Sequence, residues 1–231
     1  MKKILYSILA CLLVLFTSCE KTTEDTSKIT YFVTYMMNGD QTTLVPVGTT
    51  FTDPGVVAKE GEKDVTSKMT VSGSVNANKI GLYTITYSAV NVDGFASSTT
   101  RTVIVYDPNV TTDISGEYKL AATSYRLRAG AKVYYSDYKV NLTKLAPGIF
   151  TVSDFFGGYY DIRAKYGSRY AMTGLVNLTT DNRIMLLSSK VEGWGDSLDG
   201  LNNGTYNPDA KSIHWEADYA GSMTFFVDLN M

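Results

Sequence analysis

Two stretches near the C-terminus place an apolar residue at every second position, and this pattern constrains the fold more than any other feature. The stretches are Ile213–Ala217 and Met223–Leu229. Successive side chains of a β-strand point to opposite faces of the sheet, so an apolar residue at every second position gives one apolar face. The two stretches therefore predict two β-strands that each bury one face.

The rest of residues 114–231 divides into similar short segments separated by turn sequences. Eight or nine candidate strands, among them Lys132–Leu142 and Tyr159–Tyr166, follow one another without room for a crossover helix. Consecutive strands joined by short turns form antiparallel sheets. Closing such a sheet into a barrel removes its exposed edges. We therefore predict an antiparallel lipocalin-like β-barrel for residues 114–231, with a β-sandwich as the alternative.

Residues 28–107 predict a separate domain of six or seven short strands, which indicates a β-sandwich. In Gly81–Ala89, alternate residues from Tyr83 onward share one face and should line its core. The polar, proline-containing segment Asp107–Asp113 separates the two domains. Because this linker is short, we expect the relative orientation of the domains to be restricted. The sequence as a whole predicts an all-β protein.

The first 27 residues differ from both domains. Lys2 and Lys3 precede the apolar run Ile4–Phe16, which is short for a membrane span. A basic start, a short apolar core and small residues before a cleavage point are typical of a secretory signal peptide. We expect a signal peptide at residues 1–18 and a polar, flexible tether at residues 19–27.

The end of the signal peptide carries a more specific motif. Phe16-Thr17-Ser18-Cys19 resembles the lipobox of bacterial lipoproteins, which implies cleavage before Cys19 and lipidation of that cysteine. An ordinary signal peptide that happens to contain Cys19 is the alternative. The other cysteine, Cys11, would leave with the signal. The mature chain would then have no disulfide, no thiolate zinc site and no cysteine nucleophile.

Charge and side-chain chemistry argue against several functions. The formal net charge is -2, and about -4 after removal of residues 1–18, so nothing attracts the phosphates of nucleic acid. His214 is the only histidine and lies in the middle of a predicted strand, and no Gly-x-Ser-x-Gly motif accompanies it. The carboxylates show no spacing that forces a catalytic pair. We therefore expect no enzymatic activity, no metal site and no cofactor.

Aromatic residues are the strongest candidates for a ligand site. They flank Gly157-Gly158 and continue in the loop Glu192–Asp196, where Trp194 stands between two glycines. Aromatic rings beside hydrogen-bond acceptors suit a sugar or a peptide. The alternative is that the rings pack as core. The candidate ligand-binding residues are Phe155, Phe156, Tyr159, Tyr160, Trp194 and Asp196.

Several motifs also carry a family resemblance. Phe51–Val56, Gly81–Tyr87 and Arg101–Val105 resemble the bacterial immunoglobulin-like module of surface proteins, which makes the predicted sandwich immunoglobulin-like. Ser153–Tyr160 and Gly193–Asp196 resemble the C-terminal domain that follows this module in Bacteroidota surface lipoproteins of TonB-dependent nutrient-uptake loci. That C-terminal domain has no established function.

The resemblance implies a location and a set of partners. We expect a lipid-anchored protein of the outer membrane, on the cell surface, with the lipid on Cys19. It would capture a glycan or peptide nutrient, or associate with a TonB-dependent importer and its surface lipoprotein. A structural or adhesive surface protein is the alternative, and a small hydrolase is a weaker one.

Overall fold

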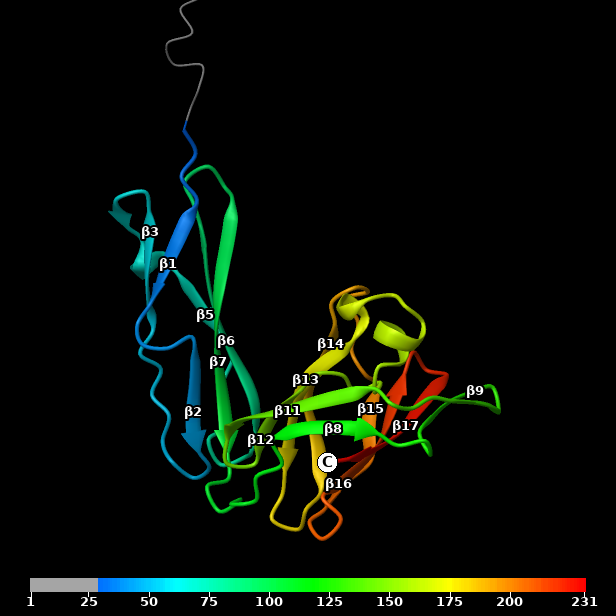
Figure 1. The fold of residues 1–231 in the computed structure, drawn as a ribbon. Helices are drawn as coiled ribbons and strands as arrows, with labels where there is room; N and C mark the ends of the chain where they lie inside the picture. Colours follow the sequence, from blue (N-terminus) through cyan, green and yellow to red (C-terminus); the bar gives the residue numbers. More distant parts are fainter. Residues whose placement is uncertain (1–28) are drawn as a thin grey trace, which may run out of the picture.

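The computed structural model describes residues 29–231, which form two β domains that contact each other (Figure 1). The expected signal peptide at 1–18, the lipidation of Cys19 and the tether at 19–27 lie outside the described residues. The structure confirms the all-β class and the order of a sandwich followed by a larger antiparallel sheet.

The first domain contains two sheets that pack as a sandwich. One sheet has the order β1 (Val33–Met37), β3 (Val56–Glu60), β4 (Lys63–Asp64), and a single turn of 3-10 helix, η1 (Thr66–Lys68), follows it. The other sheet has the order β2 (Thr42–Pro46), β7 (Ala96–Tyr106), β6 (Gly81–Val90), β5 (Thr70–Ser72). Strand β2 runs parallel to β7, while the other pairs are antiparallel. Ile85, Tyr87 and Ala89 are buried, which confirms the predicted core face of β6.

The second domain is one continuous antiparallel sheet of ten strands. Along most of the sheet, neighbouring strands follow the order β10 (Ala131–Tyr134), β9 (Tyr125–Arg128), β17 (Met223–Asn230), β8 (Gly116–Leu120), β11 (Lys139–Ala146), β12 (Ile149–Val152), β13 (Met172–Leu178), β14 (Ile184–Val191). The remaining strands, β15 (Gly200–Asn207) and β16 (Ser212–Tyr219), join the other side of β17.

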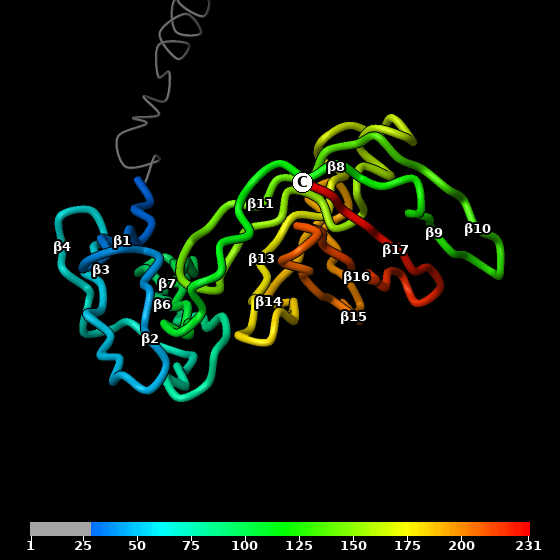
Figure 2. Tube along the Cα trace, turned by 60° about the horizontal axis from the view of Figure 1, so that its bottom comes forward, coloured from blue at the N-terminus to red at the C-terminus, as the bar shows by residue number. Residues whose placement is uncertain are grey.

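This sheet curls into a half-barrel. Strands β14 and β15 face each other across a seam without forming a regular pair. An isolated bridge joins Arg183, which directly precedes β14, to Thr205 of β15. A groove of about 400 Å³ runs along this seam and is lined by both strands. The β9–β10 hairpin extends away from the curled sheet (Figure 2).

The alternation of apolar residues in Ile213–Ala217 and Met223–Leu229 correctly predicts the buried faces of β16 and β17. Trp215 and Ala217 on β16, and Phe225 and Val227 on β17, have no exposed area. They belong to one large apolar core of the second domain. The Trp215 indole N–H donates a hydrogen bond of 2.9 Å to the backbone oxygen of Phe155, so even the polar atom of this buried ring is satisfied.

Two predicted strands are wrong. Lys132–Leu142 is not one strand, because the chain breaks between β10 and β11, where Asp137 has a φ of 69°. A positive φ cannot be accommodated within a regular strand. Tyr159–Tyr166 is not a strand either. Its first part, Tyr159–Arg163, is a π-helical turn (η2), and a 3-10 turn, η3 (Ser168–Tyr170), follows it before β13.

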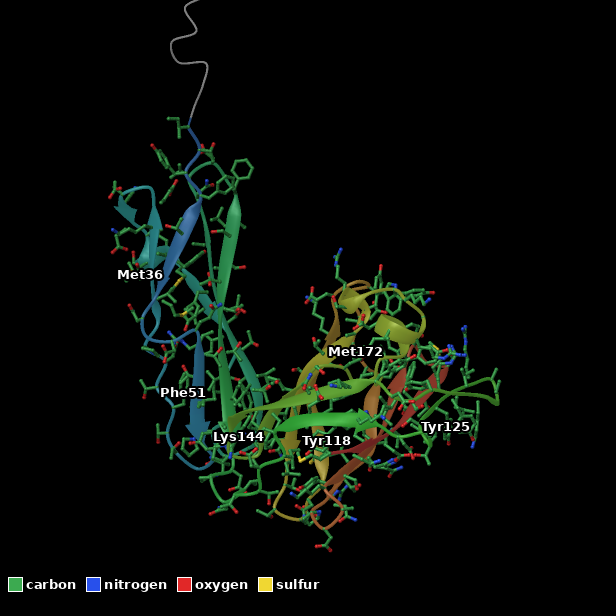
Figure 3. All side chains as sticks on the ribbon, viewed as in Figure 1. Met36, Phe51, Tyr118, Tyr125, Lys144 and Met172 are labelled. Atoms are coloured by element: carbon green, nitrogen blue, oxygen red, sulfur yellow. The ribbon has the colours of Figure 1, made fainter. Side chains whose placement is uncertain are left out.

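The segment between the domains is fixed to the second domain. Val110 and Ile114 are buried in that domain's core. A separate apolar cluster then joins the two domains, with Ile104 of β7 against Ala146 and Ile149. Figure 3 shows Lys144, next to this junction, and Tyr125 at the opposite end of the second domain. Buried apolar contact of this kind restricts domain motion. No helix in residues 29–231 is long and apolar enough to cross a membrane.

Candidate functional site

The loop between β12 and η2 is held by one buried carboxylate. Asp154 accepts hydrogen bonds from the backbone N–H groups of Phe156 at 2.9 Å, Met172 at 3.0 Å and Gly158 at 2.8 Å. Gly157 and Gly158 have φ values of 60° and 84°, which favour glycine. These contacts turn the chain back into the domain, so the two glycines do not form the tip of a hairpin.

The fold of this loop divides the candidate aromatic residues into two groups. Phe155 and Phe156 have no exposed area and Tyr159 is 5% exposed. These three pack as core, which is the alternative that the sequence left open. Tyr160 is half-buried and Trp194 is 40% exposed, so both reach the surface.

The Trp194 loop, residues 192–199, joins β14 to β15 and is braced against η3. The Gly193 N–H donates to the Arg169 backbone oxygen at 2.7 Å. A Cβ atom on Gly193 would come within 2.5 Å of the Tyr170 ring, so a side chain there would displace that ring. The absence of a side chain at Gly193 therefore allows the Tyr170 ring to pack against the loop.

Three tyrosines make edge-on contacts with Trp194, and these four side chains form what we call the aromatic surface: Tyr160, Tyr166, Tyr170 and Trp194. The Trp194 ring centroid lies 4.9 Å from that of Tyr160, 4.8 Å from Tyr170 and 6.0 Å from Tyr166. All three contacts are edge-on, the arrangement that aromatic quadrupoles favour. Tyr166 is 56% exposed, which makes it the outermost ring of the surface.

Polar groups border the aromatic surface on the side of β16. The Tyr219 hydroxyl donates a hydrogen bond of 2.7 Å to Asp196. Burial and this carboxylate hold the pKa of Tyr219 well above its usual value, so the phenol stays protonated and fixes Asp196. Two further carboxylates, Asp199 and Asp218, line a groove of about 310 Å³. The surface thus combines a ring platform with exposed acceptors.

Sequence reasoning brought Tyr160, Trp194 and Asp196 together correctly as neighbours but did not include Tyr166, Tyr170 or Tyr219. Tyr166 and Tyr170 stand on either side of Gly167, just after the end of the predicted strand Tyr159–Tyr166. Their shared position on one surface depends on the η2 and η3 turns, and such short turns have no periodic sequence pattern from which they could be predicted.

The buried Asp154 makes stability depend on pH. Burial raises its pKa to about 7, and the three N–H donors only partly offset this effect. An unfolded aspartate titrates near pH 3.9. The folded state therefore binds the extra proton between these values, and stability must fall as the pH rises through 7. We expect the free energy of unfolding to decrease between pH 5 and pH 8, measured by urea denaturation. An Asp154→Asn variant should lose this dependence, and an unchanged slope in that variant would contradict the assignment.

The surroundings of His214 bear on the hydrolytic alternative. The His214 ring nitrogens face Asp228 at 2.7 Å and Glu216 at 3.9 Å. Within residues 29–231 no serine hydroxyl is hydrogen-bonded to this ring, so no Ser–His–Asp arrangement forms there. The same residues contain no cluster of three potential metal ligands.

Comparisons with known proteins agree with this organisation. A family model described as a bacterial surface protein, Ig-like domain, matches residues 25–105, and a model for a C-terminal domain matches residues 107–231. The crystal structure of the lipoprotein BT2262 from Bacteroides thetaiotaomicron is 40% identical, with a TM-score of 0.50, and the match covers 87% of this chain and 100% of that chain.

A structure of CBM51-2 in complex with GlcNAc and INT domains from Clostridium perfringens ZmpB is 18% identical, with a TM-score of 0.26, over 52% of this chain and 29% of that chain. None of the curated proteins compared with the chain matches it.

The immunoglobulin-like sandwich joined to a half-barrel defines a two-domain bacterial surface protein. More particularly, the chain belongs to the family of the lipoprotein BT2262 from Bacteroides thetaiotaomicron.

Proposed function

We propose that this protein is a lipid-anchored accessory lipoprotein of the outer membrane that captures a glycan or peptide nutrient at the cell surface. The lipid is on Cys19, after removal of residues 1–18. The ligand binds to the aromatic surface, with Asp196 as a hydrogen-bond acceptor. The protein delivers this ligand to a TonB-dependent importer and its surface lipoprotein.

One observation carries the binding role. Trp194 is 40% exposed although four tyrosine rings, including Tyr219, pack around it, so its orientation is fixed while part of its ring remains free. A rigid, partly exposed indole binds sugar rings or peptide side chains at a small cost in conformational entropy. The immunoglobulin-like domain supports a role as the spacer that separates this surface from the membrane.

A non-catalytic role fits the polar groups of the site. Asp196 is engaged by Tyr219 and Asp154 is fully buried beneath the loop, so neither is arranged as half of a hydrolytic pair. A structural or adhesive role remains the second candidate, because immunoglobulin-like modules also serve as spacers in adhesive proteins. Growth of a deletion strain on single nutrients, compared with its adhesion, separates the two roles.

The Trp194→Ala variant tests the binding role. Loss of a central aromatic contact costs about 2 kcal/mol or more in binding, so affinity should fall at least about thirtyfold. The free energy of unfolding should fall by about 1–3 kcal/mol, less than for a fully buried tryptophan, because the ring is partly exposed but also packs against tyrosines. Calorimetry against a panel of oligosaccharides and short peptides, with the full-length protein in detergent, measures both affinity and selectivity.

Phe95→Ala provides the matched control. Phe95 is 51% exposed and lies in the first domain, so its loss removes a similar exposed ring away from the aromatic surface. Binding should remain at the wild-type level in this variant. Flat titrations for wild type and Trp194→Ala alike would contradict the proposed function, as would recovery of no importer component from solubilised outer membranes.

A further inference from the structure

Two arginines meet beside the aromatic surface, and a third lies two residues from one of them on the same strand. Arg126 and Arg128 belong to β9, and Arg163 ends η2. The guanidinium carbon of Arg126 is 5.0 Å from the Tyr159 ring centroid, and that of Arg163 is 5.1 Å from the same centroid. Two cations therefore converge on one ring, although they repel each other.

These arginines have no anionic partner among residues 29–231. Elsewhere in the same domain some exposed cations form salt bridges, such as Lys119 with Asp137 at 2.8 Å and Lys139 with Glu117 at 2.6 Å. No such bridge forms at Arg126, Arg128 or Arg163. The Arg126 Nε–H is also buried without any hydrogen-bond acceptor. A guanidinium has five donors in a rigid fork that matches a carboxylate, so this group has unused binding capacity.

The arginine cluster is continuous with the aromatic surface through neighbouring rings. Tyr159 and Tyr160 have centroids 5.1 Å apart, and Tyr160 is 4.9 Å from Trp194. The charges of Arg126 and Arg128 also act on Tyr160, where they lower a pKa that burial raises. One short oligomer stacked on Trp194 can therefore extend to the guanidinium groups.

We propose that Arg126, Arg128 and Arg163 bind a carboxylate of the ligand held by the aromatic surface, so that the captured nutrient is acidic. This inference rests on the proposed function and specifies its ligand class. Two sources share this chemistry, an oligosaccharide that contains uronic acids and a peptide rich in glutamate. Bidentate pairing of a guanidinium with the carboxylate supplies both affinity and orientation. The carboxylate also relieves the repulsion between the two cations at Tyr159.

Four probes test the proposal on the full-length protein in detergent. They are a trimer of galacturonic acid, a neutral trimer of galactose, a tetraglutamate peptide and a tetraglutamine peptide. We expect at least one acidic probe to bind about tenfold or more tightly than its neutral counterpart, and this affinity to fall with increasing salt. Whichever acidic probe binds identifies the source of the carboxylate.

The double variant Arg126→Gln/Arg163→Gln should reduce the affinity for the acidic probe at least about tenfold and leave that for the neutral counterpart unchanged. The matched control, Lys119→Gln/Lys139→Gln, removes two charges from the same domain and should bind as the wild type does. If Arg126→Gln impairs folding, the exposed pair Arg128→Gln/Arg163→Gln takes its place, with the same expected result.

The outcomes separate this inference from the proposed function. Equal binding of acidic and neutral probes, or equal losses in the arginine variant and its lysine control, would overturn the inference alone, provided that Trp194→Ala still weakens binding. If neither the four probes nor the wider panel binds, the inference and the proposed function fail together.

Discussion

Replacing Arg101 by methionine is expected to lower the free energy of unfolding of the first domain by about 3–5 kcal/mol, the usual cost of removing one partner from a buried ion pair. Arg101 has no exposed area. Its Nε lies 3.1 Å from a carboxylate oxygen of Asp53 and 3.3 Å from the Tyr87 hydroxyl. Its terminal nitrogens donate to the backbone oxygens of Asn38, Asp40 and Gly55.

The effect comes from the groups that remain after the substitution. Methionine keeps the apolar stem but satisfies neither the Asp53 carboxylate nor the three carbonyl oxygens, which lie 46 to 63 residues before Arg101 in the sequence. Arg101→Lys restores one charge without the planar fork, so an intermediate loss is expected. Far-UV circular dichroism reports on both domains. Tryptophan fluorescence reports on the second domain, because both tryptophans lie there.

The expected result is an early transition in circular dichroism that precedes the loss of tryptophan fluorescence in urea. Lys63→Met, at an exposed cation of β4 in the same domain, should leave both curves close to the wild type. A shift of less than about 1 kcal/mol for Arg101→Met would contradict a central role of this guanidinium.

Asp154→Ala should destabilise the second domain by about 3 kcal/mol or more and abolish ligand binding as well. The substitution leaves three buried N–H donors without acceptors, and each unsatisfied donor costs about 1–3 kcal/mol. The loop that these bonds hold also positions Phe156, whose ring lies 5.2 Å from Tyr160 and 5.0 Å from Tyr219. Loss of the loop geometry therefore removes the support of the aromatic surface.

Tryptophan fluorescence measures this prediction directly, because Trp215 donates its hydrogen bond to Phe155 in the same loop. Asp154→Asn should cost less than alanine. Its carbonyl oxygen keeps the bonds to Phe156 and Met172, whereas its amide faces the Gly158 N–H. Asp161→Asn on η2 is the matched control and should unfold like the wild type. A stable Asp154→Ala protein with normal binding would show that the loop holds its shape without this carboxylate.

The parts of the fold that follow from local patterns were predictable from the sequence. Every second residue in Ile213–Ala217 is apolar, which correctly predicted the buried face of β16 because strand geometry depends only on neighbouring residues. The loop at Phe155 and Phe156 was not predictable in this way. Its shape depends on a hydrogen bond from Met172 to Asp154, 18 residues apart, and such tertiary contacts leave no periodic signal.

The candidate site shows the same limit. Trp194 between two glycines is visible as a loop residue in the sequence, and the structure places it at the surface. The sequence did not predict the arginine cluster, because three strands, β10, β11 and β12, lie between Arg126 and Arg163, which come together only when β9 lies beside η2. Which residues share a surface depends on tertiary contacts between segments that are distant in the sequence.

The single bridge between β14 and β15 has a mechanical consequence for the Trp194 loop. A fully hydrogen-bonded β-barrel has a fixed circumference. This half-barrel is joined at the seam by the bridge between Arg183 and Thr205, so its circumference can change without loss of a continuous row of hydrogen bonds between strands. The loop that carries Trp194 and Asp196 connects these two strands. The same loop is hydrogen-bonded to η3 through Gly193, so widening of the seam would not separate the indole from the tyrosine rings that hold it.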